Sequence, residues 1–96
     1  MAGLDAIYQI LNMLTGIFVM LIIIQFVISL LFAFNVVNTS NQFLVAVYNS
    51  IASIVDPILR PIRQMLPNTG AIDFSPIVLI VILRIIMIVL AAIIYG

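Results

Sequence analysis

Residues 56–76, DPILRPIRQMLPNTGAIDFSP, decide the fold because they form the main polar interruption of an otherwise apolar chain. The stretch holds all four prolines, two of the three basic residues and two of the three acidic ones. Soluble domains carry about 25% charged residues, whereas this chain of 96 residues is 67% hydrophobic and 6% charged. So short a chain cannot bury that much apolar surface within itself. We therefore expect a membrane protein in which the proline-rich stretch links two spans.

The first span is predicted at residues 13–34, which read MLTGIFVMLIIIQFVISLLFAF without a charge. About 20 apolar residues cross the hydrocarbon core as a helix. The apolar character begins near Ile7, so the helix either tilts or projects beyond the membrane. A signal peptide fits poorly, because there is no basic segment and the run exceeds about 7–15 residues. One face is expected to meet protein, by helix packing or at a pore: Thr15, Ile22, Gln25, Ser29 and Ala33.

An amphipathic helix is predicted at residues 42–55, after a polar break at residues 35–41. Ser40 or Asn41 can cap its start. The segment is too short and too polar to span, so we expect it to lie on the membrane surface or on its own hairpin. The apolar face comprises Leu44, Val47, Tyr48, Ile51, Ile54 and Val55, and the polar face comprises Gln42, Asn49, Ser50 and Ser53.

The proline-rich stretch is predicted to form a kink or two short helical turns. Pro57 suits a first helical position, but Pro61 would remove a hydrogen bond from a continuous helix and clash with it. A turn at residues 67–70 then leads to Asp73 or Ser75, either of which can cap the next helix.

Residues 74–95 are predicted to form the second transmembrane helix. The expected fold is all-α, with residues 1–96 as a single membrane domain. It is a two-transmembrane-helix hairpin, with an interfacial amphipathic helix and a proline-rich loop of short helices, residues 56–76, between the spans.

Arg84 interrupts the second span near the middle of the membrane. It lies nine residues beyond Ser75, about 14 Å at 1.5 Å per residue, where an arginine costs about 2.5–3.5 kcal/mol on insertion scales. Gln25 lies nine residues before Phe34, so Gln25 and Ser29 are the predicted intramembrane partners of Arg84. Its charge would be neutralised by a carboxylate, by a lipid headgroup drawn inward or by a partner protein. The alternative is an arginine satisfied by carbonyl oxygens alone.

Arg60 and Arg63 predict the orientation, because they are the only basic residues outside the spans. The positive-inside rule places the connecting region in the cytoplasm and both termini on the opposite side. Asp56 and Arg60 could pair at i, i+4, for a few tenths of a kcal/mol. The region either holds a loop in shape or docks a partner, and the predicted docking residues are Asp56, Arg60, Arg63 and Asp73.

The composition removes most reactive groups. The chain has no cysteine and no histidine, so thiolate chemistry, most zinc sites, histidine-ligated haem and the usual general base are excluded. The net charge of zero gives no electrostatic footprint for nucleic acid. We expect no catalytic residue, metal site or cofactor, and hence no enzyme, because helix capping explains Asp56 and Asp73.

The stretch DPILRPIRQMLPNTGAIDFSPIVLIVIL resembles the signature of the YggT family, also called YlmG-related. Many members carry a second basic residue after Arg63, where this chain has Gln64. The resemblance implies a small integral membrane protein of the bacterial inner (plasma) membrane without established enzymatic activity. It also implies links to osmotic stress, to cell division or chromosome distribution, or to maturation of b-type cytochrome. The residues that carry it are Asp56, Pro57, Leu59, Arg60, Pro61, Arg63, Pro67, Gly70, Asp73, Ser75 and Pro76.

The leading functional hypothesis is a non-enzymatic membrane adaptor. It would bind other integral membrane proteins, as an assembly factor or accessory subunit of a larger, cytochrome-containing or energy-transducing complex. The alternatives are an oligomeric transport or osmotic-stress component and a division or chromosome-distribution factor. Membrane lipids, a larger membrane complex and further copies of the chain are the expected partners.

Overall fold

A computed structural model of the protein describes residues 2–38, 40–66 and 73–96. The turn predicted at residues 67–70 lies outside these ranges. The described residues form three helices and no strand: α1 Ala2–Ala33, α2 Gln42–Met65 and α3 Ser75–Tyr95.

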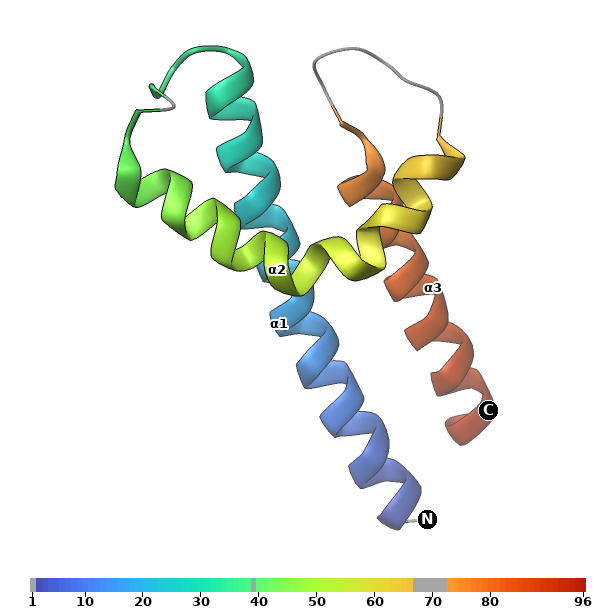
Figure 1. Ribbon diagram of the computed structural model, residues 1–96. Helices are drawn as coiled ribbons and strands as arrows, with labels where there is room; N and C mark the ends of the chain where they lie inside the picture. The colour runs from blue at the N-terminus through green and yellow to red at the C-terminus, as the bar shows by residue number, and fades with distance from the viewer. Residues whose placement is uncertain (1, 39, 67–72) are drawn as a thin grey trace.

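The predicted all-helical architecture is confirmed, but the number of spans is not. In the described chain all three helices are long and apolar enough to cross a membrane, by length and composition. α1 and α3 run antiparallel with both chain ends close together, and α2 lies across the pair (Figure 1). Length and composition therefore do not single out the two spans of the predicted hairpin.

α1 is longer than the predicted span and ends at a specific cap. It begins at Ala2 rather than at residue 13, and Asp5 lies in its first turn, where the helix dipole favours a negative charge. Asn35 adopts a left-handed conformation, with φ 57°. The backbone N–H of Val36 donates to the Leu31 carbonyl at 3.0 Å. This is the hydrogen bond of a Schellman cap, and it explains why the helix stops at the predicted polar break.

α2 is one continuous helix, so the predicted end at residue 55, the alternative of two short turns and the capping role of Asp56 are wrong, whereas the alternative of a kink agrees with its bend. Asn41 caps its start, because its side chain accepts a hydrogen bond from the Leu44 N–H at 3.2 Å. Pro57 and Pro61 both lie within the helix. They are spaced four residues apart on one exposed face, so their rings do not disturb the packed side. Figure 1 shows α2 bent near its middle, as expected of a helix that contains prolines.

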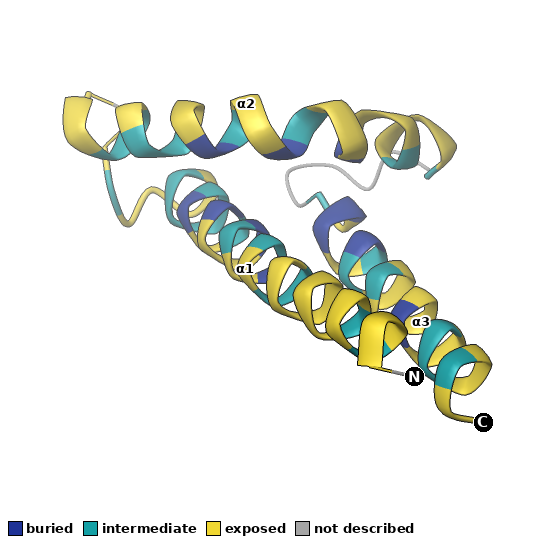
Figure 2. Ribbon diagram, turned by 90° about the horizontal axis from the view of Figure 1, so that it is seen from below, coloured by how far each residue is buried: buried dark blue, intermediate teal, exposed yellow. Residues whose placement is uncertain are grey.

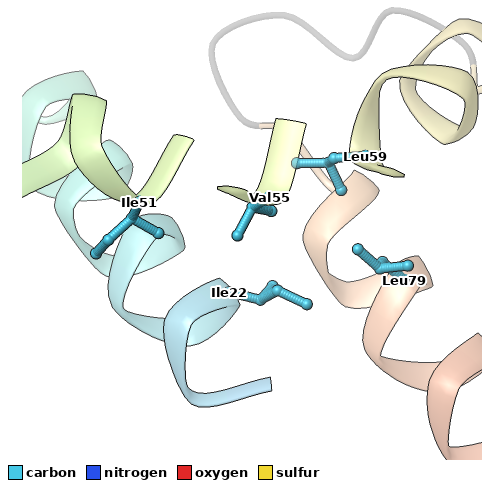
Figure 3. Packing of buried hydrophobic residues seen from close by; sticks show 5 residues of the cluster. All are labelled: Ile22, Ile51, Val55, Leu59 and Leu79. Atoms are coloured by element: carbon cyan, nitrogen blue, oxygen red, sulfur yellow. The ribbon is translucent and has the colours of Figure 1, made fainter. Parts of the chain in front are cut away.

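The core is an apolar seam between α2 and the other two helices (Figure 3). Ile51, Val55 and Leu59 follow one another at four-residue spacing on α2 and pack with Ile22 of α1 and Leu79 of α3. Val55 and Ile22 are fully buried. This apolar seam attaches α2 to α1 and α3.

The outer side of α2 is exposed along its whole length (Figure 2). The predicted polar face is confirmed as exposed, and most of the predicted apolar face is buried or half-buried. Ile54 is the exception, since it is 55% exposed. It lies beside the seam rather than in it, because Val55 takes the buried position of that turn.

Contacts near both ends of α3 fix its register on α1. At one end, Tyr95 donates a hydrogen bond to Asp5, and its ring meets Tyr8 edge-to-face with centroids 5.3 Å apart. At the other end, Gln25 of α1 and Pro76 of α3 line the same small cavity. α3 therefore lies beside the first two thirds of α1, and the last turns of α1 extend past the start of α3.

Candidate functional site

Four polar side chains, called the polar cluster below, join the three helices where α3 begins. Gln25 of α1 donates from Nε2 to Asp56 of α2 at 3.5 Å. Arg63 of α2 lies 3.9 Å from the Asp56 carboxylate. Its Nε also donates to the Asp73 carboxylate at 2.9 Å. The polar cluster thus links α1 to α2 and α2 to the residue that leads into α3.

Asp73 also organises the first turn of α3. Its Oδ1 accepts the Ser75 backbone N–H at 3.0 Å and the Ser75 hydroxyl at 2.6 Å. The formal cap position belongs to Phe74, whose side chain makes no capping hydrogen bond. Asp73 therefore satisfies a free N–H group of the helix start from one residue earlier. The sequence correctly assigned this role to Asp73 or Ser75.

The surroundings of Asp73 favour its charged form. Burial alone would raise the pKa of this carboxyl. The hydrogen bonds from Ser75 and the positive charge of Arg63 outweigh burial, so the pKa lies below the ordinary value of 3.8. Asp73 is therefore ionised near neutral pH, which keeps its bonds to Arg63 and Ser75 in their charge-assisted form.

The ion pairs of the polar cluster position the helices more than they stabilise them. The Arg63 side chain is 45% exposed, that of Asp56 30% and that of Asp73 36%. Ion pairs this open to their surroundings contribute about 0–1 kcal/mol each. The apolar seam supplies more of the attachment of α2, while the polar cluster fixes which residues of α2 face α1 and α3.

A small cavity lies inside the polar cluster. Its volume is about 10 Å³, the smallest size that accommodates one water molecule. Gln25 is 4% exposed, and its Oε1 has no hydrogen-bond partner among the described residues. The cavity therefore has room for about one water molecule. The lining residues are Gln25, Phe26, Ser29, Tyr48, Leu59, Arg63, Asp73 and Pro76.

Three of the four predicted docking residues come together here. Asp56, Arg63 and Asp73 form the core of the polar cluster, whereas Arg60 lies exposed on the outer side of α2. The ion pair expected between Asp56 and Arg60 is replaced by one between Asp56 and Arg63. Arg63 is seven positions beyond Asp56, so the two residues lie on the same side of α2. The ion pair with Asp73 also holds Arg63 on this side.

The predicted pairing of Arg84 with Gln25 and Ser29 is wrong. Gln25 donates to Asp56, and Ser29 lines the cavity. Arg84 is exposed on α3. The prediction assumed that Gln25 and Arg84 lie at the same depth. Gln25 instead lies level with Pro76. Pro76 is eight residues from Arg84, or about 12 Å along the helix.

Two contacts between helices, one in the polar cluster and one at the far end of α3, were not predicted from the sequence. The bond between Gln25 and Asp56 depends on α2 crossing α1, which no single-helix pattern reveals. The bond between Asp5 and Tyr95 depends on the register of α3. The early apolar start of α1, near Ile7, was the one sequence signal that could have indicated the bond between Asp5 and Tyr95.

Among the described residues there is no group of three or more histidine, cysteine, aspartate or glutamate side chains that could hold a metal ion. The contacts of the apolar seam and the polar cluster fix α2 across α1 and α3, and the outer side of α2 stays exposed.

Comparison with known proteins assigns the family. The family model CCB3/YggT matches residues 4–94. The protein named "Uncharacterized protein YggT" in Escherichia coli K12, and its counterparts in strains O6:H1 and O157:H7, are each 54% identical over 33 residues. This match covers 34% of this chain and only 18% of each relative. No solved structure matches the chain. Since the family model covers nearly the whole sequence, the chain belongs to the CCB3/YggT family.

Proposed function

We propose that this protein is a non-enzymatic membrane adaptor that binds other integral membrane proteins, as an assembly factor or accessory subunit of a larger complex. The observation that carries the proposal is the position of α2 across α1 and α3. Its buried side is held by the apolar seam and the polar cluster, and its outer side stays exposed. A helix fixed in this way is a preformed surface, which loses little conformational freedom when a partner binds.

The outer face of α2, the proposed docking surface, is polar and bears one cation. Its exposed polar side chains are Gln42, Asn49, Ser50, Ser53, Arg60 and Gln64. Polar groups of this kind suit contact with another protein or with lipid headgroups better than contact with lipid tails, because burying unpaired polar groups in an apolar medium is costly. Arg60 gives the surface a preference for acidic groups on a partner.

We assign the two spans to α1 and α3. The distance along α1 from Asp5 to Gln25 is 20 residues, and the distance along α3 from Ser75 to Tyr95 is also 20 residues. Each corresponds to about 30 Å of helix. This length equals the thickness of the hydrocarbon core. Tyr8 and Tyr95 then lie at one interface and the polar cluster at the other. α2 is the least apolar of the three helices and lies at the interface with its polar face outward.

The positive-inside rule supports a cytoplasmic position for α2 and the polar cluster, in a bacterial inner membrane. The chain lacks cysteine, so single cysteines report orientation directly. In intact cells, a membrane-impermeant maleimide should label Gly3→Cys, a position with open space around it, and not Ser50→Cys, and should label both after lysis. The opposite labelling pattern would show that the protein has the reverse orientation. Labelling of both positions in intact cells would rule out this topology.

Copurification from native membranes in a gentle detergent tests the adaptor function. Defined membrane proteins should be recovered with the wild-type chain. Charge reversal by Arg60→Glu should lower their recovery about tenfold, because like charges at an interface are strongly unfavourable. Asn38→Asp is the matched control, because it adds a negative charge at an exposed position outside α2, on the same side of the proposed membrane. Recovery of the chain alone, or equal recovery with both variants, would contradict the proposal.

A further inference from the structure

Arg84 lies in the middle of an outward apolar stripe of α3, called the Arg84 stripe below. Val81, Ile85 and Ile88 are 51%, 53% and 68% exposed. They stand three, one and four positions from Arg84, so all four share one side of the helix. Arg84 is itself exposed and is not among the residues that line the cavity, so it belongs to the outward side of α3.

Neither membrane surface is within easy reach of this charge. Arg84 is nine residues from Ser75 and eleven from Tyr95, about 14 Å and about 17 Å along the helix. Arginines near helix ends extend to the interface, whereas charged residues deep in a span almost always pair with another group or face a water-filled cavity. Lipid phosphates lie at the surface, about half the bilayer thickness away.

The chain cannot supply the counter-charge itself. Its three acidic residues are Asp5, Asp56 and Asp73. Asp5 lies level with Tyr95 at the far end of α3, and the other two belong to the polar cluster at its start. A second copy, in either orientation, would carry its aspartates near the ends of the spans. Self-association through the Arg84 stripe would therefore leave the arginine without an anion.

We propose that the Arg84 stripe binds a transmembrane helix of another protein through an aspartate or glutamate near the middle of that helix. The guanidinium offers a planar fork of donors that a carboxylate accepts with two parallel hydrogen bonds. The apolar neighbours on the stripe pack against the same helix. This inference rests on the proposed adaptor function but concerns a different surface, inside the membrane rather than on α2.

The test uses the purified full-length chain in lipid vesicles with synthetic transmembrane peptides as probes. Each peptide is a leucine-rich helix of about 20 residues, with aspartate, asparagine or leucine at its centre, or with the aspartate moved to one end. Energy transfer between labelled chain and peptide reports binding. The central-aspartate peptide should bind about tenfold more tightly than the central-leucine peptide. Equal binding of these two peptides would overturn the proposal.

Variants connect the preference to Arg84. Arg84→Leu should abolish it, and Arg84→Lys should keep part of it, because a lysine keeps the charge but not the fork. Asn12→Leu is the control: it removes an exposed polar side chain from α1 and should change nothing. A preference that survives Arg84→Leu would contradict the proposal. Circular dichroism checks that each variant keeps its helices.

Native membranes separate this inference from the adaptor function. Partners that are lost with Arg60→Glu, together with equal binding of all peptides, would overturn the acidic-helix contact and leave the adaptor function standing. Selective peptide binding with no native partner recovered would support the contact and contradict the adaptor function.

Discussion

Arg63 and Arg84 carry the same charge in opposite settings. Arg63 of α2 lies beside the start of α3 and contacts two aspartates of its own chain. Arg84 lies in the middle of α3, faces outward and takes part in no ion pair among the described residues. With α1 and α3 as the proposed spans, Arg63 is paired near the membrane surface, whereas Arg84 is left unpaired within the apolar part of the membrane. One arginine serves the fold, and the other is suited to a partner.

The largest effect is expected from the apolar seam rather than from either arginine. Leu59 is 1% exposed, so Leu59→Ala should destabilise the protein by about 2–5 kcal/mol through lost contacts and the cavity that it leaves. Steric trapping in mild detergent measures the change. Ile58→Ala is the control, because Ile58 is 49% exposed. An equal loss for both would contradict the seam as the main attachment of α2.

Arg84→Leu should act in the opposite direction on the isolated chain. Removing the arginine should favour membrane insertion of α3 by about 2.5–3.5 kcal/mol. A glycosylation-based insertion assay measures this. Adding Ile93→Arg to that variant places an arginine near the helix end, where its side chain reaches the interface. This arginine should raise the free energy of insertion less than Arg84 does. Equal costs at both positions would contradict the assigned depth.

Asp73→Ala should have a smaller effect, about 1–2 kcal/mol of lost stability, because it removes the bonds to Ser75 and Arg63. Asp56→Ala should cost less, since the contacts of Asp56 are longer, at 3.5 and 3.9 Å. The same unfolding measurement compares the two. A larger loss for Asp56→Ala would show that the link to α1 matters more than the start of α3.

The smallest effect is a dependence on pH. Because its folded-state pKa lies below 3.8, Asp73 contributes stability that is fully present above that value. The contribution is lost as the pH falls through the lower folded-state pKa. The stability difference between wild type and Asp73→Asn should therefore be constant from neutral pH to about pH 5 and shrink below it. If the stability difference between wild type and Asp73→Asn grew on acidification, the pKa of Asp73 would be raised in the folded state rather than lowered, which would contradict the prediction.

Local features were readable from the sequence because their causes are local. The cap at Asn41, the role of Asp73 before α3 and the polar break near Asn35 each follow from one side chain and its nearest backbone groups. The exposed polar face of α2 follows from its periodicity. The helix continued past Pro57 because both prolines fall on the unpacked face, which depends on where α2 meets its neighbours.

The register of α3 on α1 could not be predicted. Both helices are apolar on nearly every side, so sliding one along the other changes few contacts that a sequence pattern can count. The hydrogen bond between Asp5 and Tyr95 and the shared cavity of Gln25 and Pro76 decide it in three dimensions. The assumption that the polar residues of two spans lie at equal depth therefore misplaced Gln25 by about 12 Å relative to Arg84.

The crossing of α2 makes the molecule wider at one end than at the other (Figure 1). With α1 and α3 as the spans, one leaflet accommodates three helices and the opposite leaflet only two. A protein of this wedge-like cross-section fits best where the leaflet that holds α2 is positively curved. Amphipathic interfacial helices are sensitive to such curvature. The protein would then gather at curved regions of the membrane, where its local concentration rises before any partner is bound.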